Sequence, residues 1–508
     1  KHENPFPAIC GRICPHKCES ACSRCEIDKA VAIDEIKKFI ADQDLNLKNR
    51  YVPKLRHHYG KRIAVIGAGP AGLSCAYYLA IDGYKVTVFE KQEALGGMMT
   101  LGIPNYRLEK DVVNAEIDIL KELGVEFKTG IEVGKDVSLD ELRNQDYKAF
   151  YLAIGAQKGR KLGIEGEDHR DVMSGVDFLR EVNLNKANKL SGNVVVIGGG
   201  NVAIDVARTA VRMEAKNVGM YCLENRAQMP ALEEEIEEAL DEAIQIHNSW
   251  GPKRIVIENN QVVGVEFKKC VSVFDENKRF SPKFDENDIL FVEANTVLVS
   301  VCQAIEWGNL LENSDAKFNP NKTLIADAFT YQTNQPDIFT GGDCYTGPRF
   351  AIDAIAAGKQ AAISIHRYVQ PGQSLVNGRD RREYVAIDKE NFDFQGYDRI
   401  PRESVKTHYK TTGKEAFSDA RPTFSEAQMK KETSRCLGCG ATVIDEYMCV
   451  GCGQCTTKCK FDAISLVRTY NSGGASYEEL KPLVVKNIIK RQGRILVKNV
   501  KNAFAREE

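Results

Sequence analysis

The amino-acid sequence predicts an α/β fold with two Rossmann-like dinucleotide-binding domains, preceded by a small helical cysteine-rich domain and followed by a further cysteine-rich domain. Two glycine-rich fingerprints predict the central part, Gly67-Ala68-Gly69-Pro70-Ala71-Gly72 and Gly198-Gly199-Gly200-Asn201-Val202-Ala203. A cluster of cysteines near each end predicts the outer domains. A chain of 508 residues is too long for one hydrophobic core, so about three or four domains are expected.

The bulk composition disfavours several classes of protein. A net charge of −2 gives no support for nucleic-acid binding, and no apolar run reaches the roughly 18 residues of a membrane span. Eleven of the 16 cysteines fall in the two terminal clusters, which is typical of metal ligands and unlike the disulfides of a short secreted chain. No signal peptide is visible, and we expect a cytoplasmic protein.

The N-terminal cluster contains five cysteines, Cys10, Cys14, Cys18, Cys22 and Cys25. The spacing of the first four would bring their thiols near one another on successive helical turns. One [4Fe–4S] cluster is expected here, with Cys25 as a spare thiol or an alternative ligand. A structural metal or free cysteines are the alternatives.

The first fingerprint follows a predicted strand over residues 62–66 and opens a predicted helix that continues through Leu79. Its glycines allow a tight turn and let backbone N–H groups approach a pyrophosphate at the helix N-terminus. A second strand over residues 85–89 leads to Glu90, whose carboxylate can accept hydrogen bonds from ribose hydroxyls. These features together predict a dinucleotide site.

A flavin is the dinucleotide expected at this first site. Nicotinamide cofactors transfer two electrons as a hydride, whereas iron–sulfur clusters pass single electrons. A chain that binds both therefore needs a cofactor, such as a flavin, that can exchange electrons in pairs and one at a time. A strand-to-glycine crossing over residues 152–156, a strand from residue 338 that leads to Asp343, and a helix over residues 351–362 follow in the order of a flavin domain. The residues expected to bind FAD are Gly67, Gly69, Pro70, Ala71, Gly72, Glu90, Lys91, Gly97, Ile103, Arg107, Ala153, Gly155, Gly342, Asp343 and Ala351.

The second fingerprint predicts the nicotinamide site. It follows a strand over residues 193–197 and has alanine as its third member, a permitted variant. The next strand, over residues 218–222, leads to a carboxylate that favours a free ribose 2′-hydroxyl, so we expect NAD(H) in preference to NADP(H), although an arginine lies nearby. The residues expected there are Gly198, Gly200, Asn201, Val202, Ala203, Glu224 and Arg226. The acidic run from Glu233 to Glu242 is expected to be a solvated helix face.

The C-terminal cluster combines a cysteine pair, Cys436 and Cys439, with a ferredoxin-like run, Cys449, Cys452, Cys455 and Cys459. The run has the spacing of bacterial ferredoxins, with Lys460 where proline is usual, and predicts one [4Fe–4S] cluster. Six cysteines cannot fill two all-cysteine clusters. The leftover pair would therefore form an incomplete second site, act as substitute ligands or bind zinc, and a structural zinc site is the alternative for the whole region.

Together these motifs resemble the family of the bacterial glutamate synthase small subunit. The same family includes the N-terminal half of dihydropyrimidine dehydrogenase and the large subunit of NADH-dependent ferredoxin:NADP transhydrogenase. The likeness covers roughly residues 4–370, including Asn4-Pro5-Phe6-Pro7, Cys10-Gly11-Arg12-Ile13-Cys14-Pro15, residues 102–108, Met229-Pro230-Ala231 and Gly341-Gly342-Asp343.

The resemblance implies a disulfide-reductase-like plan in which Asp343 holds the flavin ribityl chain. It also implies two N-terminal iron–sulfur clusters whose further cysteines lie upstream of the Asn-Pro-Phe-Pro motif and do not occur in this sequence. Relatives have a Gln or Glu ligand near the position of Lys37, which a lysine does not easily replace.

The expected domains are a helical iron–sulfur domain (1–59), an FAD-binding domain in two segments (60–164 and 301–370) and an NAD(P)-binding domain (165–300). A charged linker (371–425), compatible with a tether, a ferredoxin-like domain (426–470) and a C-terminal helical extension (471–508) follow.

Three functions compete. The first is an NAD(P)H-dependent FAD and iron–sulfur subunit of an electron-bifurcating complex, with ferredoxin and other redox subunits as partners. The second is an electron-feeding subunit of a glutamate-synthase-type enzyme, and the third is a nucleotide-binding scaffold with structural metals. Because hydride passes directly between nicotinamide and flavin, no residue is expected to act as a catalytic acid, base or nucleophile.

Overall fold

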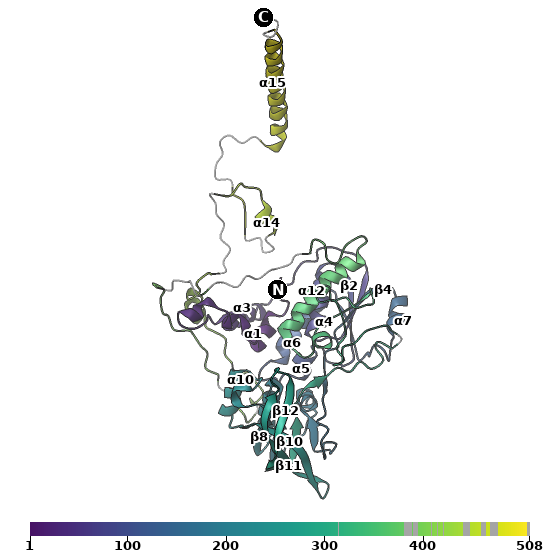
Figure 1. Ribbon diagram of the computed structural model, residues 1–508, viewed down its shortest axis with the longest axis vertical. Helices are drawn as coiled ribbons and strands as arrows, with labels where there is room; N and C mark the ends of the chain where they lie inside the picture. Colours follow the sequence, from purple (N-terminus) through teal and green to yellow (C-terminus); the bar gives the residue numbers. More distant parts are fainter. Residues whose placement is uncertain are drawn as a thin grey trace. The chain divides into compact units, whose positions relative to one another are not determined.

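The computed structural model describes residues 1–312, 314–379, 389, 395–407, 409–413, 415–419, 421–439, 448–458, 464–467 and 476–504. The chain forms two compact units, Lys1–Cys439 and Gly440–Glu508. The first unit contains both parallel sheets and the N-terminal helices (Figure 1).

The N-terminal cysteines lie on short helices. These are α1 (Pro7–Ile13), α2 (Lys17–Ser20), the 3-10 turn η1 (Ser23–Glu26) and α3 (Ile33–Leu45). Pro7 starts α1, where its missing N–H and fixed φ suit the first helical turn. Helices α1 and α3 approach closely at Gly11, where a Cβ would lie 2.8 Å from the Lys38 Cα. This contact holds α1, which carries Cys10, against α3.

The first sheet is parallel and has the strand order β15-β4-β1-β2-β3. Its strands are β1 (Arg62–Ile66), β2 (Lys85–Glu90), β3 (Glu126–Thr129), β4 (Tyr147–Leu152) and β15 (Ile338–Thr340). Its helices are α4 (Pro70–Ile81), α5 (Met98–Leu101), α6 (Lys110–Glu122), α7 (Leu139–Asn144), α11 (Asp343–Thr346) and α12 (Ala351–Val369). The strands predicted from residues 62, 85 and 338 are confirmed. Helix α4 continues two residues beyond the predicted Leu79, and α12 continues to Val369.

Helices α4 and α12 pack side by side, as Figure 1 shows. Gly358 permits this because a Cβ there would lie 2.2 Å from the Ala71 carbonyl oxygen. The core beneath them includes Val65, Leu73 and Ile355. This packing brings the strand-to-helix turn of the first fingerprint beside the start of α12.

The second sheet is also parallel, in the order β6-β13-β7-β8-β9. Its strands are β6 (Val172–Ser174), β7 (Asn193–Ile197), β8 (Asn217–Cys222), β9 (Gln245–Asn248) and β13 (Thr296–Val299). Its helices are α8 (Gly175–Asn183), α9 (Asn201–Arg212), the 3-10 turn η2 (Arg226–Gln228) and α10 (Glu233–Asp241). Both predicted strands are confirmed. A two-stranded pairing of β5 (Lys158–Gly159) with β14 (Gln303–Ala304) lies where the chain passes between the two sheets.

A third, antiparallel sheet has no counterpart in the sequence analysis. It consists of β10 (Trp250–Glu258), β11 (Gln261–Phe274) and β12 (Phe280–Glu293). Asn259 and Asn260 join the first two strands with φ of 48° and 60°. A two-residue turn with positive φ at both positions is a strong hairpin signal. The Asn-Asn pair between two β-rich segments could therefore have revealed this sheet.

The described residues from 395 to 439 belong to the first unit. They include α13 (Glu426–Ser434), which starts at a capping box formed by Ser425 and Gln428. Two residues of the segment expected to be a linker make contacts with other domains. The Arg208 guanidinium lies 4.3 Å from the centroid of the Tyr409 ring, and Arg421 forms an ion pair with Glu35 at 2.6 Å. These residues are therefore packed against both the nicotinamide-type domain and the N-terminal helices.

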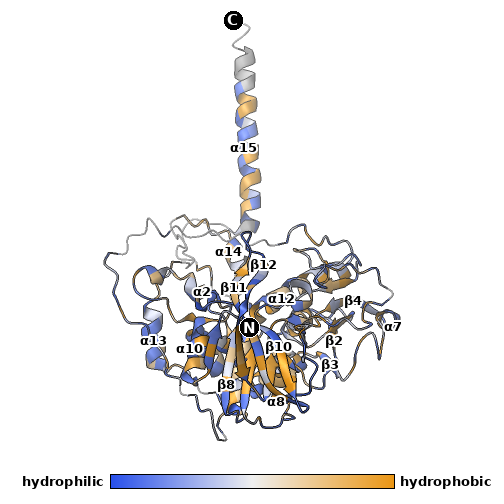
Figure 2. Ribbon diagram, turned by 60° about the horizontal axis from the view of Figure 1, so that its bottom comes forward, coloured by the Kyte–Doolittle hydropathy of each residue, from blue (hydrophilic) through white to orange (hydrophobic). Residues whose placement is uncertain are grey.

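The second unit contains α14 (Gln454–Lys458) and α15 (Tyr477–Phe504). Figure 2 shows apolar and polar residues alternating along α15, and Val485, Ile489 and Leu496 are among its exposed apolar side chains. Within the described residues, no helix combines the length and apolar character required to cross a membrane.

Candidate cofactor-binding site

The first fingerprint forms a tight turn between β1 and α4. A Cβ at Gly67 would lie 2.4 Å from the Ala153 carbonyl oxygen, and one at Gly72 would lie 1.9 Å from the Gly67 carbonyl oxygen. A Cβ at Gly69, by contrast, would meet no atom within 4 Å. Gly67 and Gly72 are thus required by packing, whereas Gly69 leaves open space at the N-terminus of α4, where backbone N–H groups can meet a phosphate.

Glu90 lies at the end of β2 and is buried. Its carboxylate accepts hydrogen bonds from the N–H groups of Ala68 and Gln92 at 2.8 and 2.9 Å. Burial raises the pKa of Glu90, and these N–H groups oppose the shift. Glu90 lines one small cavity together with Gly67, Lys91 and Gly155, so its carboxylate lies beside the first fingerprint.

A larger cavity of about 430 Å³ begins at the same turn. Fourteen of its lining residues bear on cofactor binding, and they come from several segments. They are Cys14, Gly69, Pro70, Ala71, Gly97, Ile103, Arg107, Ala153, Gly155, Asn201, Val202, Gly342 and Asp343, with Ala351 at the start of α12. All but Cys14 are predicted nucleotide-binding residues, and both fingerprints therefore open into one cavity.

The Asp343 carboxylate lines this cavity, where it can accept hydrogen bonds from a ligand. Burial raises its pKa to about 6, and Arg349 N–H donates to its Oδ1 at 3.2 Å. The adjacent Gly342 has a φ of 72°, and a Cβ there would lie 2.9 Å from the Ala71 Cβ. A ligand with hydroxyl donors would complete the hydrogen bonding of this carboxylate.

The second fingerprint repeats this construction between β7 and α9. A Cβ at Gly198 would lie 2.4 Å from the Ser300 carbonyl oxygen, whereas one at Gly200 would meet only the Pro230 Cγ, at 3.9 Å. Ala203 is fully buried under the turn, as expected for the third member of the fingerprint. Asn201 accepts a hydrogen bond from Leu232 N–H at 2.8 Å through its side chain, which fixes the loop opposite the turn.

The predicted ribose carboxylate, Glu224, lies beside the second turn. A Cβ at Gly199 would lie 3.0 Å from Glu224 Oε2. Arg226 forms an ion pair with Glu233, on the first turn of α10. Neither Glu224 nor Arg226 lines the larger cavity, whereas Asn201 and Val202 of the second fingerprint do.

Arg107 joins the two dinucleotide domains. Its guanidinium donates to Asp205 at 2.7 Å and to Glu235 at 2.5 Å, both on the nicotinamide-type domain. The expectation of a solvated acidic face on α10 is therefore wrong in part: Glu235 is buried, and Glu242 forms ion pairs with two arginines of α9. The sequence did contain a signal for these ion pairs, because the acidic residues of α10 follow a helix that carries Arg208 and Arg212.

Sequence reasoning missed a second set of cavity residues next to Arg107. Tyr106 packs under the Arg212 guanidinium, with 3.9 Å to the ring centroid, and Tyr409 also lines the cavity. The guanidinium of fully buried Arg208 contacts both rings. The contact joins three distant parts of the sequence, so no local pattern predicts it.

The N-terminal cysteines lie in and around α2: Cys18 is part of this helix, Cys10 and Cys14 precede it, and Cys22 and Cys25 follow it. Burial is the main cause that raises the pKa of Cys10 and Cys18, and the neighbouring Cys14 raises both further. Lys37 Nζ is 2.9 Å from Asp34 Oδ1 and also interacts with Cys14, so it supplies a cation beside this trio. Cys22 and Cys25 lie at the two ends of one turn, where Cys25 N–H donates to the Cys22 carbonyl at 3.1 Å.

The predicted C-terminal ligands are divided between the two units. Cys436 and Cys439 belong to the first unit, whereas Cys449, Cys452 and Cys455 belong to the second. These five thiols are exposed and none forms a disulfide, while Cys459 lies outside the described residues. Across the described part of the chain, no three His, Cys, Asp or Glu side chains converge closely enough to hold a metal ion.

The geometry fits the cofactors that the sequence predicts. The open face at Gly69, the carboxylates of Glu90 and Asp343 and the joined cavity suit a dinucleotide with a ribityl chain. The cysteines supply thiolates, the usual ligands of iron–sulfur clusters, and such sites commonly close around the metal only when it binds.

Comparison with known families agrees with this geometry. The profile described as pyridine nucleotide-disulphide oxidoreductase matches residues 61–358. A profile for dihydropyrimidine dehydrogenase domain II with a 4Fe-4S cluster matches residues 1–49, and a 4Fe-4S binding domain profile matches residues 442–465. The predicted iron–sulfur motifs at both ends are thus confirmed.

Individual relatives give the same result. The chain is 33% identical over 473 residues to the NADP(+)-dependent formate dehydrogenase subunit beta of Moorella thermoacetica, covering 86% of this chain and 66% of that protein. It is 32% identical over 392 residues to the glutamate synthase [NADPH] small chain of Escherichia coli, covering 72% and 81%. The structure of Mycobacterium tuberculosis FprA in complex with NADPH has the same fold, with a TM-score of 0.53, 19% identity and coverage of 61% and 84%. The chain therefore belongs to the pyridine nucleotide-disulphide oxidoreductase family, among the flavin and iron–sulfur oxidoreductases related to the glutamate synthase small chain.

Proposed function

We propose that this protein transfers electrons between NAD(P)H and iron–sulfur acceptors through bound FAD. One observation carries the proposal: Gly69 of the first fingerprint, Asn201 of the second and Cys14 of the N-terminal domain line the same cavity. Bound FAD would supply the exchange of electron pairs with a nicotinamide and of single electrons with a cluster. The protein's own residues bind and orient the reactants and provide no acid, base or nucleophile.

FAD would lie along the first fingerprint, with its adenosine ribose at Glu90 and its ribityl chain at Asp343. Support comes from the two cavities that meet at Gly155, one lined by Glu90 and the other by Asp343. The nicotinamide would enter over Asn201 and Val202 and reach the flavin across the larger cavity. Arg107 would position the two domains for this transfer through its ion pairs with Asp205 and Glu235.

NAD(H) would be the preferred nicotinamide cofactor. The Glu224 carboxylate approaches the fingerprint backbone at Gly199, where it suits a free 2′-hydroxyl and repels a phosphate. Arg226, two residues after Glu224 in the sequence, is already paired with Glu233 and is less available for a phosphate.

The protein would act as one subunit of an electron-bifurcating transhydrogenase or related complex, with ferredoxin and other redox subunits as partners. The second iron–sulfur motif, at residues 442–465, supports an additional exit for electrons. A second candidate, an electron-feeding subunit of a glutamate-synthase-type enzyme, is favoured by the 32% identity that covers 81% of the Escherichia coli small chain.

Anaerobic rapid mixing of the full chain with NADH or NADPH tests the proposal. Either nucleotide should bleach the bound flavin, and reduced-cluster signals should follow by electron paramagnetic resonance. NADH should reduce the flavin faster than NADPH does, and the Glu224→Gln variant should show a smaller difference between the two reduction rates. An NADPH preference above about tenfold, roughly 1.4 kcal/mol, would overturn the role of Glu224, and a flavin that neither nucleotide reduces would refute the proposed function.

A further inference from the structure

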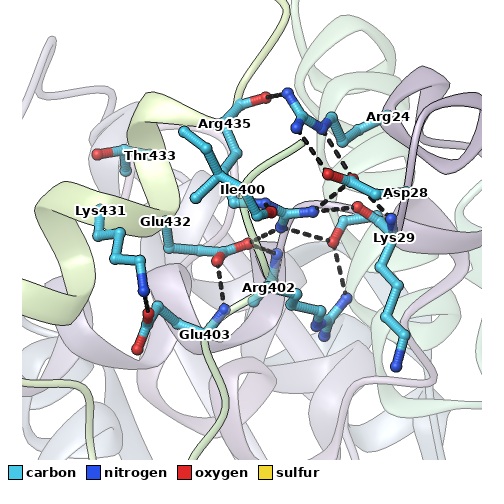
Figure 3. Close-up of polar contacts among 12 residues, drawn as sticks. Arg24, Asp28, Lys29, Ile400, Arg402, Glu403, Lys431, Glu432, Thr433 and Arg435 are labelled. Atoms are coloured by element: carbon cyan, nitrogen blue, oxygen red, sulfur yellow. Dashed lines mark hydrogen bonds and ion pairs between the residues drawn. The ribbon is translucent and has the colours of Figure 1, made fainter. Parts of the chain in front are cut away.

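A buried network fastens two neighbouring parts of the chain to the N-terminal helices, and Figure 3 shows Arg435 and Glu432 within it. The Arg435 guanidinium donates to the Ile400 carbonyl at 2.9 Å and forms an ion pair with Glu432 at 2.5 Å. Glu432 also accepts hydrogen bonds from Glu403 N–H at 2.7 Å and Ala32 N–H at 2.8 Å. Both charges are fully buried, which is tolerated only because they are paired and hydrogen-bonded. The chain therefore leaves this base after Glu403 and returns to it at Glu432.

The part of the chain between these two points forms a loop that we call the strap. Its described residues are 404–407, 409–413, 415–419 and 421–431. The strap lies outside the three profiles that match the chain, because the pyridine nucleotide-disulphide oxidoreductase profile ends at residue 358 and the C-terminal profile begins at residue 442. It is therefore an addition to the domains that these profiles describe.

The strap first contacts the nicotinamide-type domain. The Tyr409 ring centroid lies 4.3 Å from the Arg208 guanidinium of α9, and the Tyr409 hydroxyl donates to Glu238 of α10 at 3.1 Å. Arg212 Nε donates to the Ala416 carbonyl at 2.7 Å, and both residues are buried. Two points of the strap thus hold the helices that follow the second fingerprint.

The next residues of the strap contact the other two domains. Asn105 of the flavin-type domain donates to the Phe417 carbonyl at 2.9 Å through its side-chain nitrogen. Arg421 forms ion pairs with Asp34 at 3.0 Å and Glu35 at 2.6 Å, both on α3. Between residues 409 and 421 the strap therefore connects all three domains of the first unit.

The strap also forms part of the wall of the larger cavity, which Tyr409, Asp419 and Arg421 line. Both fingerprints open into this cavity, so its shape depends on how the two dinucleotide domains are placed. Domains of one chain move relative to each other unless their contacts prevent it. Reacting atoms must approach to about 3–3.5 Å, and a misplacement of about 1 Å can cost a hundredfold in rate.

We propose that the strap fixes the nicotinamide-type domain in the position from which a bound nicotinamide reaches the flavin, with Tyr409 as its positioning residue. Tyr409 would act through Arg208 and Glu238 and take no part in the chemistry. This inference rests on the proposed function, because it concerns the step in which NAD(P)H reduces FAD.

Rapid mixing of the full chain with NADH tests the proposal. Tyr409→Ala should lower the limiting rate of flavin reduction between about tenfold and a hundredfold, while the FAD content and the affinity for NADH change little. Tyr409→Phe keeps a ring beside Arg208 and should recover most of this rate. Tyr397→Ala is the matched control, because Tyr397 is 44% exposed, and it should keep the wild-type rate.

Loosening the base of the strap should have the same effect as removing its contact with α9. Arg435→Met should therefore lower the limiting rate, although Arg435 does not line the cavity. Because both changes act through one loop, the double variant with Tyr409→Ala should be no slower than the slower single variant. The proposal is overturned by an unchanged rate or a loss of FAD in Tyr409→Ala, by an equal loss of rate in Tyr397→Ala, or by losses that multiply in the double variant.

Hydrogen exchange distinguishes a failure of this inference from a failure of the proposed function. In Tyr409→Ala, peptides from α9 and from residues 103–108 should exchange faster than in the wild type and in Tyr397→Ala, with no nucleotide added. A wild-type flavin that neither NADH nor NADPH reduces would refute the proposed function and leave this measurement valid. Unchanged exchange in Tyr409→Ala would show that the strap does not hold the domains, whatever the flavin does.

Discussion

Replacing Arg435 should release the C-terminal part of the first unit without unfolding the dinucleotide domains. Arg435→Met removes five hydrogen bonds, to the carbonyls of Ile400, Lys29 and Ala30 and to the carboxylates of Asp28 and Glu432. Removing one partner of a buried ion pair costs about 3–5 kcal/mol, mainly because the remaining charge is left buried. At about 1.4 kcal/mol per tenfold, local opening should become between roughly a hundredfold and a few thousandfold more frequent.

Hydrogen exchange measured by mass spectrometry can detect this local opening. Peptides from residues 398–436 and 24–32 should exchange faster, while peptides from β1 serve as the internal reference. Lys430→Met is the matched control on the same helix, because its ion pair with Glu426 is largely exposed and worth no more than about 1 kcal/mol. If Arg435→Met exchanges like this control, the buried network does not anchor the segment and the reasoning is refuted.

Three further predictions concern the cofactor-binding domains. Gly72→Ala should lower the melting temperature, since its Cβ would lie 1.9 Å from a backbone oxygen. Gly69→Ala should have the melting temperature of the wild type when both are measured without FAD, yet it should bind FAD more weakly. Equal melting temperatures and FAD affinities of the two variants would contradict the assigned roles. Glu90→Ala should lose flavin absorbance while its iron content is unchanged, because two backbone N–H groups lose their acceptor, and a flavin-replete variant would be evidence against the site. Burial lowers the pKa of Lys110 to about 7, although the nearby carboxylates of Glu109 and Asp205 oppose the shift. Between about pH 7 and 10 the unfolded chain therefore binds more protons than the folded chain, and the free energy of unfolding rises with pH. Lys110→Met should flatten this rise in denaturant titrations, and an unchanged dependence of the unfolding free energy on pH would show that Lys110 is not the cause.

The parts of the structure that local sequence determines were predicted well. The turns at Gly67 and Gly198 depend on glycines whose Cβ positions are filled by backbone, so the fingerprint pattern alone defines them. The burial of Glu235 could not be predicted in this way, because its partner Arg107 lies 128 residues away. The position of α13 is a still stronger case: the capping box of Ser425 and Gln428 is a local signal for the helix that the sequence analysis did not use, but the sequence of the helix carries no signal for the surface that it covers.

The order in which the ribosome makes the chain gives this last contact a further consequence. Arg24 and its partner Arg435 are 411 residues apart. At a synthesis rate of about 5–20 residues per second, the N-terminal domain waits roughly 20–80 seconds before α13 exists. During that time Asp28 and the carbonyl of Ala30 are without the arginine that later covers them. The N-terminal helices are therefore made long before the helix that completes their hydrogen bonds, and a chain terminated before Arg435 would carry them without these partners.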